Sequence, residues 1–287
     1  MSVRLAPKAK FQELWSARSL KMSERIELMR LVTGTKSLVR LVAEERTYQA
    51  LRNLIGSLGF SCTISTVKQA QITMSSGDIY TRTVEWNDPA GVCFSIFVST
   101  DTDLIEEAIT LEADNSGDSN NNNVRMANLL GYPQCCVEHY NLNQDSIDWL
   151  RSILNTHTEG LPVQAAANPL ARYFTGHSLI PDFFPCSLSC SGTQQLSVYS
   201  IEALLFFEMK EKYEEILSAL IKPVFQLGED AICQYVSNAS CKTSSRTQLA
   251  YWGNVKKDRF SYWSKEVNKQ NFDGINHPVI KKIVFSL

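Results

Sequence analysis

The sequence predicts an α+β protein, in which a small antiparallel sheet is joined to a predominantly helical remainder that carries a Cys-rich site. Three observations lead to this prediction. β-Branched and aromatic residues are concentrated in residues 60–100, apolar residues recur at helical spacing on both sides of them, and two pairs of cysteines lie further along the chain. With 287 residues, 44% of them hydrophobic, the chain is long enough for one large domain or two.

Two amphipathic helices are expected before the strands. SERIELMRLVTG offers Ser23 as an N-cap and Gly34 as the residue after the helix, and EERTYQALRNLIGSLGF repeats apolar residues at helical spacing up to Gly59. SSGD and NDPAG then separate three or four antiparallel strands as turns would. The expected strands are 60–67, 71–74, 79–86 and 92–99. An acidic helix follows, with Asp103 as its N-cap.

The second half is expected to be mainly helical. DNSGDSNNNN has no apolar residue and no period, which indicates a flexible linker or insertion. A short helix should begin at Val124 and end at Gly131, and a long helix should run from about Val198 to Ile221. The predicted organisation is 1–113 for the first helices and the sheet, 114–123 for the linker, 124–241 for the helical cysteine-motif region, and 242–287 for a basic, aromatic extension.

Charge is distributed unevenly along the chain. The formal net charge is −2, but from Lys242 onward nine Lys and Arg face three Asp and Glu, so the extension carries +6 and the preceding residues carry −8. The extension interleaves these cations with aromatic residues, a combination that single-stranded RNA binding uses. Aromatic residues at near-helical spacing more often belong to a hydrophobic core than to a binding surface. A nucleic-acid partner is therefore the less favoured interpretation of the extension.

The chain is expected to be cytoplasmic. Its first residues contain no apolar stretch typical of a secretory signal, and no run approaches the ~18 apolar residues of a membrane span. In that compartment clustered cysteines bind metal or do redox work more often than they form disulfides. Of the eight cysteines four stand alone in the sequence, and Cys62 and Cys93 are interpreted as small core residues.

The two cysteine pairs define the candidate site. GYPQCCVEHY carries Cys135 and Cys136 just after a proline that should start a helix, where the positive dipole end favours thiolates. FFPCSLSC carries Cys186 and Cys190, which would share one face if they were helical. His139 stands one helical turn after the first pair. The sequence therefore predicts five candidate ligands of a thiophilic metal: Cys135, Cys136, Cys186, Cys190 and His139.

The identity of the metal stays open between two alternatives. Adjacent cysteines do not easily reach one small ion but can reach different irons, which favours an iron–sulfur cluster, [4Fe–4S] in form. Alternatively one of the two binds while the other is a free reactive thiol, so Cys135 is either a fourth ligand or a free thiol. A tetrahedral zinc site made of a cysteine of the first pair, His139, Cys186 and Cys190 is the alternative. Two interpretations without a bound metal also remain, a redox dithiol switch and a chance grouping of core cysteines.

These segments resemble a known family. LLGYPQCCVEHY followed by FFPCSLSC is similar to the GYPxCC and PCSxxC motifs of an uncharacterised family, domain-of-unknown-function family 483, over about residues 92–200. Because the family is uncharacterised, the resemblance does not indicate which activity the chain has. The Asn-rich insertion and the long C-terminal extension depart from the family's pattern.

We expect a metalloenzyme that acts on a small-molecule substrate or an amino-acid derivative by redox or sulfur-related chemistry. Arg172 is the candidate clamp for a substrate carboxylate, and His177 and Tyr132 are candidate acid/base residues. Capping, packing and surface roles are the alternatives for all three. The second hypothesis is a zinc-stabilised, non-catalytic binding protein that contacts RNA or a protein partner through the C-terminal extension.

Overall fold

A computed structural model describes most of the chain in two compact units. Unit 1 comprises Met1–Val137 and Glu202–Met209, and unit 2 comprises Glu138–Ile201 and Lys210–Leu287. The described residues are 8–17, 20–73, 79–114, 119–142, 149, 152–155, 163–170, 177–180, 183–221, 224–227, 231–237, 247–253, 280–283 and 285–286. Helices and antiparallel strands occur in both units, which confirms the α+β class.

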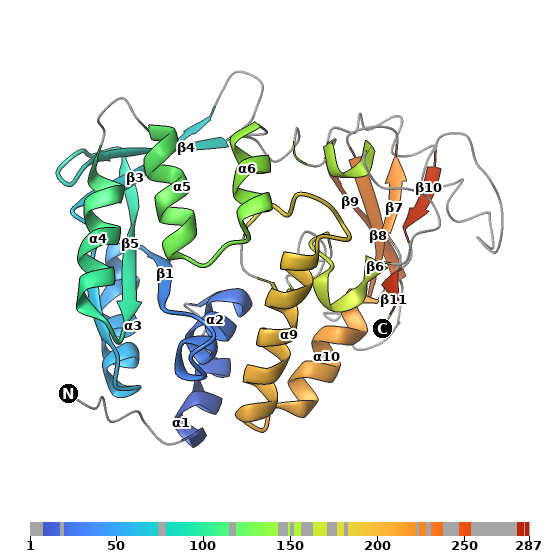
Figure 1. The fold of residues 1–287 in the computed structure, drawn as a ribbon, viewed down its shortest axis with the longest axis horizontal. Helices are drawn as coiled ribbons and strands as arrows, with labels where there is room; N and C mark the ends of the chain where they lie inside the picture. Colours follow the sequence, from blue (N-terminus) through green and yellow to red (C-terminus); the bar gives the residue numbers. More distant parts are fainter. Residues whose placement is uncertain are drawn as a thin grey trace. The chain divides into compact units, whose positions relative to one another are not determined.

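Unit 1 is built on a five-stranded antiparallel sheet whose central strand is β5 (Figure 1). β1 pairs with β5 along one side, whereas β2 and then β3 pair with its other side, and β4 continues from β3. The strands are β1 (Leu38–Ala43), β2 (Ser61–Ile64), β3 (Val67–Thr73), β4 (Ile79–Glu85) and β5 (Gly91–Ser99). The four predicted strands are present, and β1 is an additional, unpredicted strand.

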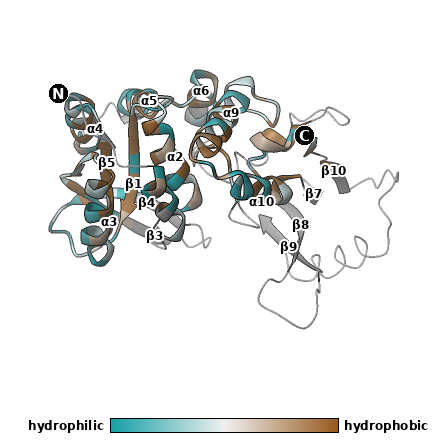
Figure 2. Ribbon diagram, turned by 90° about the horizontal axis from the view of Figure 1, so that it is seen from below, coloured by the Kyte–Doolittle hydropathy of each residue, from teal (hydrophilic) through white to brown (hydrophobic). Residues whose placement is uncertain are grey.

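Helices cover both faces of this sheet. Apolar strands β1 and β5 run between α4 and α5 on one side and α3 on the other (Figure 2). Leu38 and Phe97 face the first pair of helices and form a buried cluster with Ile105 and Met126. Tyr48 of α3 meets Phe94 on the opposite face, with ring centroids 5.6 Å apart. The helices and the short 3₁₀ turn of unit 1 are α1 (Lys8–Glu13), η1 (Leu14–Ser16), α2 (Met22–Val32), α3 (Glu45–Ser57), α4 (Thr102–Ala113) and α5 (Ser119–Leu129).

The N-caps of α2 and α4 each lie two residues before the predicted ones. The N-cap of α2 is Lys21, not Ser23, and the side chain of Glu24 accepts a hydrogen bond from the Lys21 backbone N–H at 2.7 Å. The N-cap of α4 is Asp101, not Asp103, because its carboxylate accepts the backbone N–H of Asp103. In both cases an acidic side chain satisfies an unpaired N–H group.

The predicted linker is partly helical. α5 begins at Ser119, five residues before the predicted start, so four consecutive asparagines belong to its first turns. Asn122 donates a side-chain hydrogen bond to Asp114 at 3.1 Å, and Arg125 pairs with Glu107 of α4 at 2.9 Å. These contacts with α4 and the segment that follows it offset the low helix propensity of asparagine.

Unit 2 contains the C-terminal part of α6 (Gln134–Leu142), most of α9 (Ser191–Phe206), and α10 (Lys210–Leu220). The single long helix predicted to end near Ile221 is two helices, because the chain leaves α9 at Glu208, whose φ is +61°. The unit also holds a four-stranded antiparallel sheet, ordered β10-β7-β8-β9, that the predicted helical remainder lacked. Its strands are β7 (Val224–Leu227), β8 (Ala231–Ser237), β9 (Thr247–Gly253) and β10 (Ile280–Ile283).

Two further observations complete the fold. β6 (Val163–Gln164), followed by the turn η2 (Ala165–Ala167), pairs in parallel with β11 (Phe285–Ser286). Within the described ranges no helix has both the length and the apolar character needed to cross a membrane. Most of the basic aromatic extension, residues 254–279, lies outside the described residues.

Candidate metal centre

The first cysteine pair opens helix α6, as predicted. The chain leaves α5 through Gly131, whose φ of +70° is left-handed and suits glycine, and Pro133 then sets the direction of the next helix. The Pro133 carbonyl accepts hydrogen bonds from the backbone N–H groups of Cys136 and Val137 at 2.8 and 3.1 Å. Cys135 and Cys136 therefore occupy the first turn of a nine-residue helix.

The second cysteine pair lies in a turn and not on a helix. Cys186 and Cys190 flank Ser187–Ser189, and the backbone N–H of Cys190 contacts the Ser187 carbonyl at 3.4 Å. α9 begins at the next residue, and the Cys190 carbonyl accepts its hydrogen bond from Gln194 at 3.0 Å. The predicted common helical face is wrong, but the turn still brings the two sulfurs together.

Aromatic contacts tie the second pair to the later part of α6. Trp149 is fully buried, and its indole N–H donates to the Pro185 carbonyl at 2.7 Å. Phe184 contacts the Trp149 ring at 5.0 Å and stacks on Tyr140 of α6 at 5.7 Å. Pro185, which precedes Cys186, is thus held by a hydrogen bond, and Phe184 packs against α6.

The four cysteines come together at one place. Their sulfur atoms all lie within 4.8 Å of one another, so Cys135, Cys136, Cys186 and Cys190 could hold a metal ion. The Sγ atoms of Cys135 and Cys136 are 4.0 Å apart. The two adjacent cysteines thus both belong to the group of four.

The four thiols differ in exposure. Cys136 and Cys190 are buried, Cys186 is half-buried, and Cys135 is exposed to solvent. The two other cysteines whose surroundings are described, Cys62 on β2 and Cys93 on β5, stand apart from the group. Burial raises the pKa of both the Cys62 and the Cys93 thiol, which favours their neutral form.

His139 is near the cysteines in sequence but is not one of the four grouped residues. It lies on α6, is half-buried, and burial lowers the pKa of its imidazole. Tyr132 is also half-buried and packs against the cluster around Leu38 and Phe97. Its ring centroid lies 5.6 Å from Lys36 Nζ, a cation for which no role was predicted.

The remaining candidate residues lie elsewhere or outside the described ranges. His177 is half-buried, and its Nε2 is 3.8 Å from a carboxylate oxygen of Glu215 on α10. Arg172 falls outside the described residues. Asn168, four residues before Arg172 in the sequence, is buried and donates to the Leu220 carbonyl at the end of α10 at 2.8 Å, which is a structural role.

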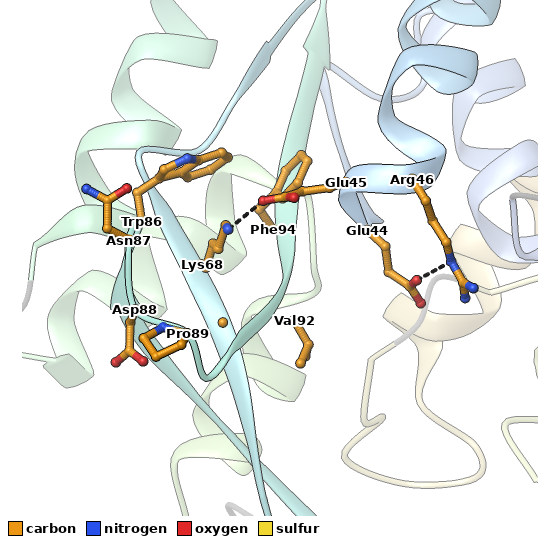
Figure 3. Close-up of a pocket in the computed structure, with 11 residues that line it drawn as sticks. Glu44, Glu45, Arg46, Lys68, Trp86, Asn87, Asp88, Pro89, Val92 and Phe94 are labelled. Atoms are coloured by element: carbon orange, nitrogen blue, oxygen red, sulfur yellow. Dashed lines mark hydrogen bonds and ion pairs between the residues drawn. The ribbon is translucent and has the colours of Figure 1, made fainter.

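A pocket of about 540 Å³ in unit 1 was not predicted (Figure 3). Its wall combines the start of α3 with the NDPAG turn, and Lys68 contacts the Trp86 ring at 5.0 Å and Glu45 at 2.6 Å. Gly91 allows this packing, since a Cβ there would meet the Lys68 side chain at 2.8 Å. The sequence predicted the turn itself, but it did not predict that Glu44, Glu45 and Arg46 line the same pocket.

Comparisons of the chain with protein families, with curated proteins and with solved structures gave no match. The fold and the site therefore define the class of protein and nothing narrower. It is an α+β protein with a group of four cysteines that could bind a metal.

Proposed function

We propose that this chain is a metalloprotein in which Cys135, Cys136, Cys186 and Cys190 together bind one thiophilic metal centre. The observation that carries the proposal is the mutual distance of their four sulfurs, all within 4.8 Å. Thiolates select zinc, iron and copper(I) over hard cations, and four of them supply a complete tetrahedral set.

The sulfur separations favour a single ion over the predicted [4Fe–4S] cluster. In a tetrahedral site with Zn–S bonds of about 2.3 Å, neighbouring sulfurs are about 3.8 Å apart. The Cys135–Cys136 separation of 4.0 Å is close to that value. In a cubane each cysteine binds a different iron, and the width of the cluster adds to every sulfur–sulfur distance. A mononuclear site, with zinc as the ion, fits these distances better.

A four-thiolate zinc ion has a structural role. Such an ion has no open coordination position, and its binding energy contributes directly to folding. Here it would join the first turn of α6 to the turn that precedes α9. This supports the non-catalytic form of the proposal, while its RNA-binding part depends on residues 254–279, which lie outside the described residues.

The metalloenzyme is the second candidate, and the exposure of Cys135 favours it. Three ligands are buried or half-buried, whereas the fourth faces solvent. A small molecule could therefore reach the centre at this one ligand, as redox or sulfur-related chemistry on a small substrate requires. An iron–sulfur cluster with one accessible iron would supply Lewis-acid chemistry at such a position.

The test is anaerobic purification followed by metal and sulfide analysis and an absorption spectrum. We expect a colourless protein with one zinc ion per chain, and loss of zinc in the Cys136→Ser and Cys190→Ser variants. Cys93→Ser is the matched control and should keep the metal, because Cys93 stands on β5 outside the group. A brown protein with iron and acid-labile sulfide would support the cluster instead. A chain that binds neither metal would contradict the proposal.

A further inference from the structure

A buried ion pair in unit 1 lies against the loop that leads to the first cysteines. Lys36 stands between α2 and β1, and its Nζ is 2.6 Å from a carboxylate oxygen of Glu27 on α2. The two side chains are only 2% and 9% exposed. Lys36 Nζ also donates a hydrogen bond to the Leu130 carbonyl at 2.7 Å, across 94 positions of sequence.

The Leu130 carbonyl belongs to the end of α5, where carbonyl groups lack partners within the helix. The backbone N–H groups of Leu130, Gly131 and Tyr132 close the helix on Met126, Asn128 and Ala127. A cation is favoured here by the negative end of the helix dipole. The Tyr132 ring, 5.6 Å from the ammonium, covers the same cation.

From this anchored carbonyl the chain reaches Cys135 in five residues. Gly131 turns the chain, and Pro133 accepts the hydrogen bond of the Cys136 N–H at 2.8 Å. The direction in which α6 starts thus depends on where α5 ends. A shift of Leu130 would displace both sulfurs of the first pair.

We propose that Lys36 is a positioning residue of the metal centre, fixing the end of α5 and thereby the first turn of α6 that carries Cys135 and Cys136. This inference rests on the proposed metal-binding function. Stability alone is a weak reason for the pair, because replacing a buried ion pair by apolar groups of similar volume is often neutral or stabilising. What an apolar replacement lacks is a donor for the Leu130 carbonyl.

The double variant E27Q/K36M tests this role. It removes both charges together, so no unpaired carboxylate is left in the core, and methionine keeps the length of the lysine side chain without its donor. The control is E45Q/K68M, which makes the same two substitutions in the Lys68–Glu45 pair on β3 and α3. Both proteins are compared with the wild type in urea unfolding, in zinc affinity by chelator competition, and in the absorption spectrum of the Co²⁺-loaded protein.

We expect E27Q/K36M to unfold cooperatively, with zinc affinity reduced by about 10- to 100-fold, as for other residues that orient metal ligands. Its Co²⁺ spectrum should also change, because the spectrum reports coordination geometry. E45Q/K68M should match the wild type in both readouts. Wild-type affinity and spectrum in E27Q/K36M, or an equal loss of affinity in the control, would overturn the inference.

Hydrogen exchange of the metal-free proteins separates this inference from the proposed function. In E27Q/K36M the amides of Tyr132, Cys136 and Val137 should exchange faster, while those of β5 stay protected. If the wild type binds no metal, the proposed function fails, yet this exchange still decides whether Lys36 holds the loop. Unchanged exchange would overturn the positioning role in every case.

Discussion

Two buried side chains hold the two cysteine segments, and they do so by different chemistry. Before Cys135 and Cys136, the ammonium of Lys36 donates to the Leu130 carbonyl. Before Cys186 and Cys190, the neutral indole N–H of Trp149 donates to the Pro185 carbonyl. The lysine needs Glu27 as a counter-ion, whereas the indole needs only the aromatic packing of Phe184.

The difference shows what each segment requires. A charged donor forms a strong hydrogen bond, but its charge must be neutralised when it is buried. The Lys36 contact therefore also requires Glu27, a second residue from α2. A tryptophan combines a large apolar surface with one hydrogen-bond donor, so the contact with Pro185 requires no counter-ion. Breaking one anchor at a time shows whether the two segments matter equally to the centre.

The largest expected effect comes from the sulfurs themselves. Cys136→Ser should abolish tight zinc binding, because a buried ligand has no solvent molecule to replace it. Cys135→Ser should weaken binding but retain it, since water can fill a position that is exposed. Zinc titrations of the two variants measure the difference. Equal losses in both would show that exposure does not decide the ligand's importance.

Removing the neutral anchor should have the next largest effect. Trp149→Phe leaves the Pro185 carbonyl buried without its donor, at a cost of about 1–3 kcal/mol in the free energy of unfolding. Zinc affinity should fall as well, because Pro185 precedes Cys186. Urea unfolding and zinc competition measure the two effects. Trp86→Phe, in the pocket of unit 1, controls for the smaller ring, and a similar loss of affinity there would contradict the anchoring role.

Two glycines offer a matched test of the turn before α6. Gly131 and Gly34 have φ values of +70° and +73°, and a Cβ at either would meet no atom within 4 Å. Alanine at each position should therefore cost about 1–2 kcal/mol of stability from backbone strain alone. Only Gly131→Ala should also reduce zinc affinity. Equal affinities for the two variants would show that the end of α5 does not control the cysteines.

The smallest effect concerns Glu24, a second buried carboxylate on α2. Burial is the main cause that raises its pKa, against hydrogen bonds from the Lys21 and Val42 N–H groups that lower it. The folded state therefore holds the proton more tightly than the unfolded chain, whose glutamate pKa is about 4.3. The stability from Glu24 is present below that pH and is lost as pH rises through the higher folded pKa.

Glu24→Gln should remove this pH dependence. Urea midpoints of wild type and variant, measured between about pH 4 and neutrality, should diverge in favour of the variant as the pH rises. Zinc affinity at neutral pH should not change, because Glu24 contacts Val42 and Lys21, neither of which belongs to the cysteine loop. A constant difference in midpoint across the range would contradict the raised pKa. A lower zinc affinity would show that α2 affects the centre through more than Glu27.

Local sequence signals were sufficient where the structure depends on neighbours in the chain. Turn residues and the concentration of β-branched and aromatic residues located β2 to β5, and Gly34, Gly59 and Gly131 marked the ends of helices, where all three have positive φ. The proline before Cys135 predicted the start of α6. These features are decided by backbone preferences within a few residues.

Pairing between distant segments escaped the same reasoning. β1 is a short apolar strand, LVRLVA, that exists because it pairs with β5 more than fifty residues away. The helical first turns of α5 contain residues that favour loops, and contacts with α4 outweigh that preference. In the second sheet β7, β8 and β9 pair with their neighbours in the chain, but β10 pairs with β7, more than fifty residues away.

The sequence by itself determined the candidate ligands, because prolines and paired cysteines are local features whose chemistry does not depend on the fold. Only the tertiary structure decided that the four sulfurs lie within 4.8 Å of one another and that Cys135 alone among them is exposed. It also assigned Lys36 to Leu130 and Trp149 to Pro185. Such contacts depend on how the chain packs, because burial and long-range distances are properties of the folded molecule as a whole.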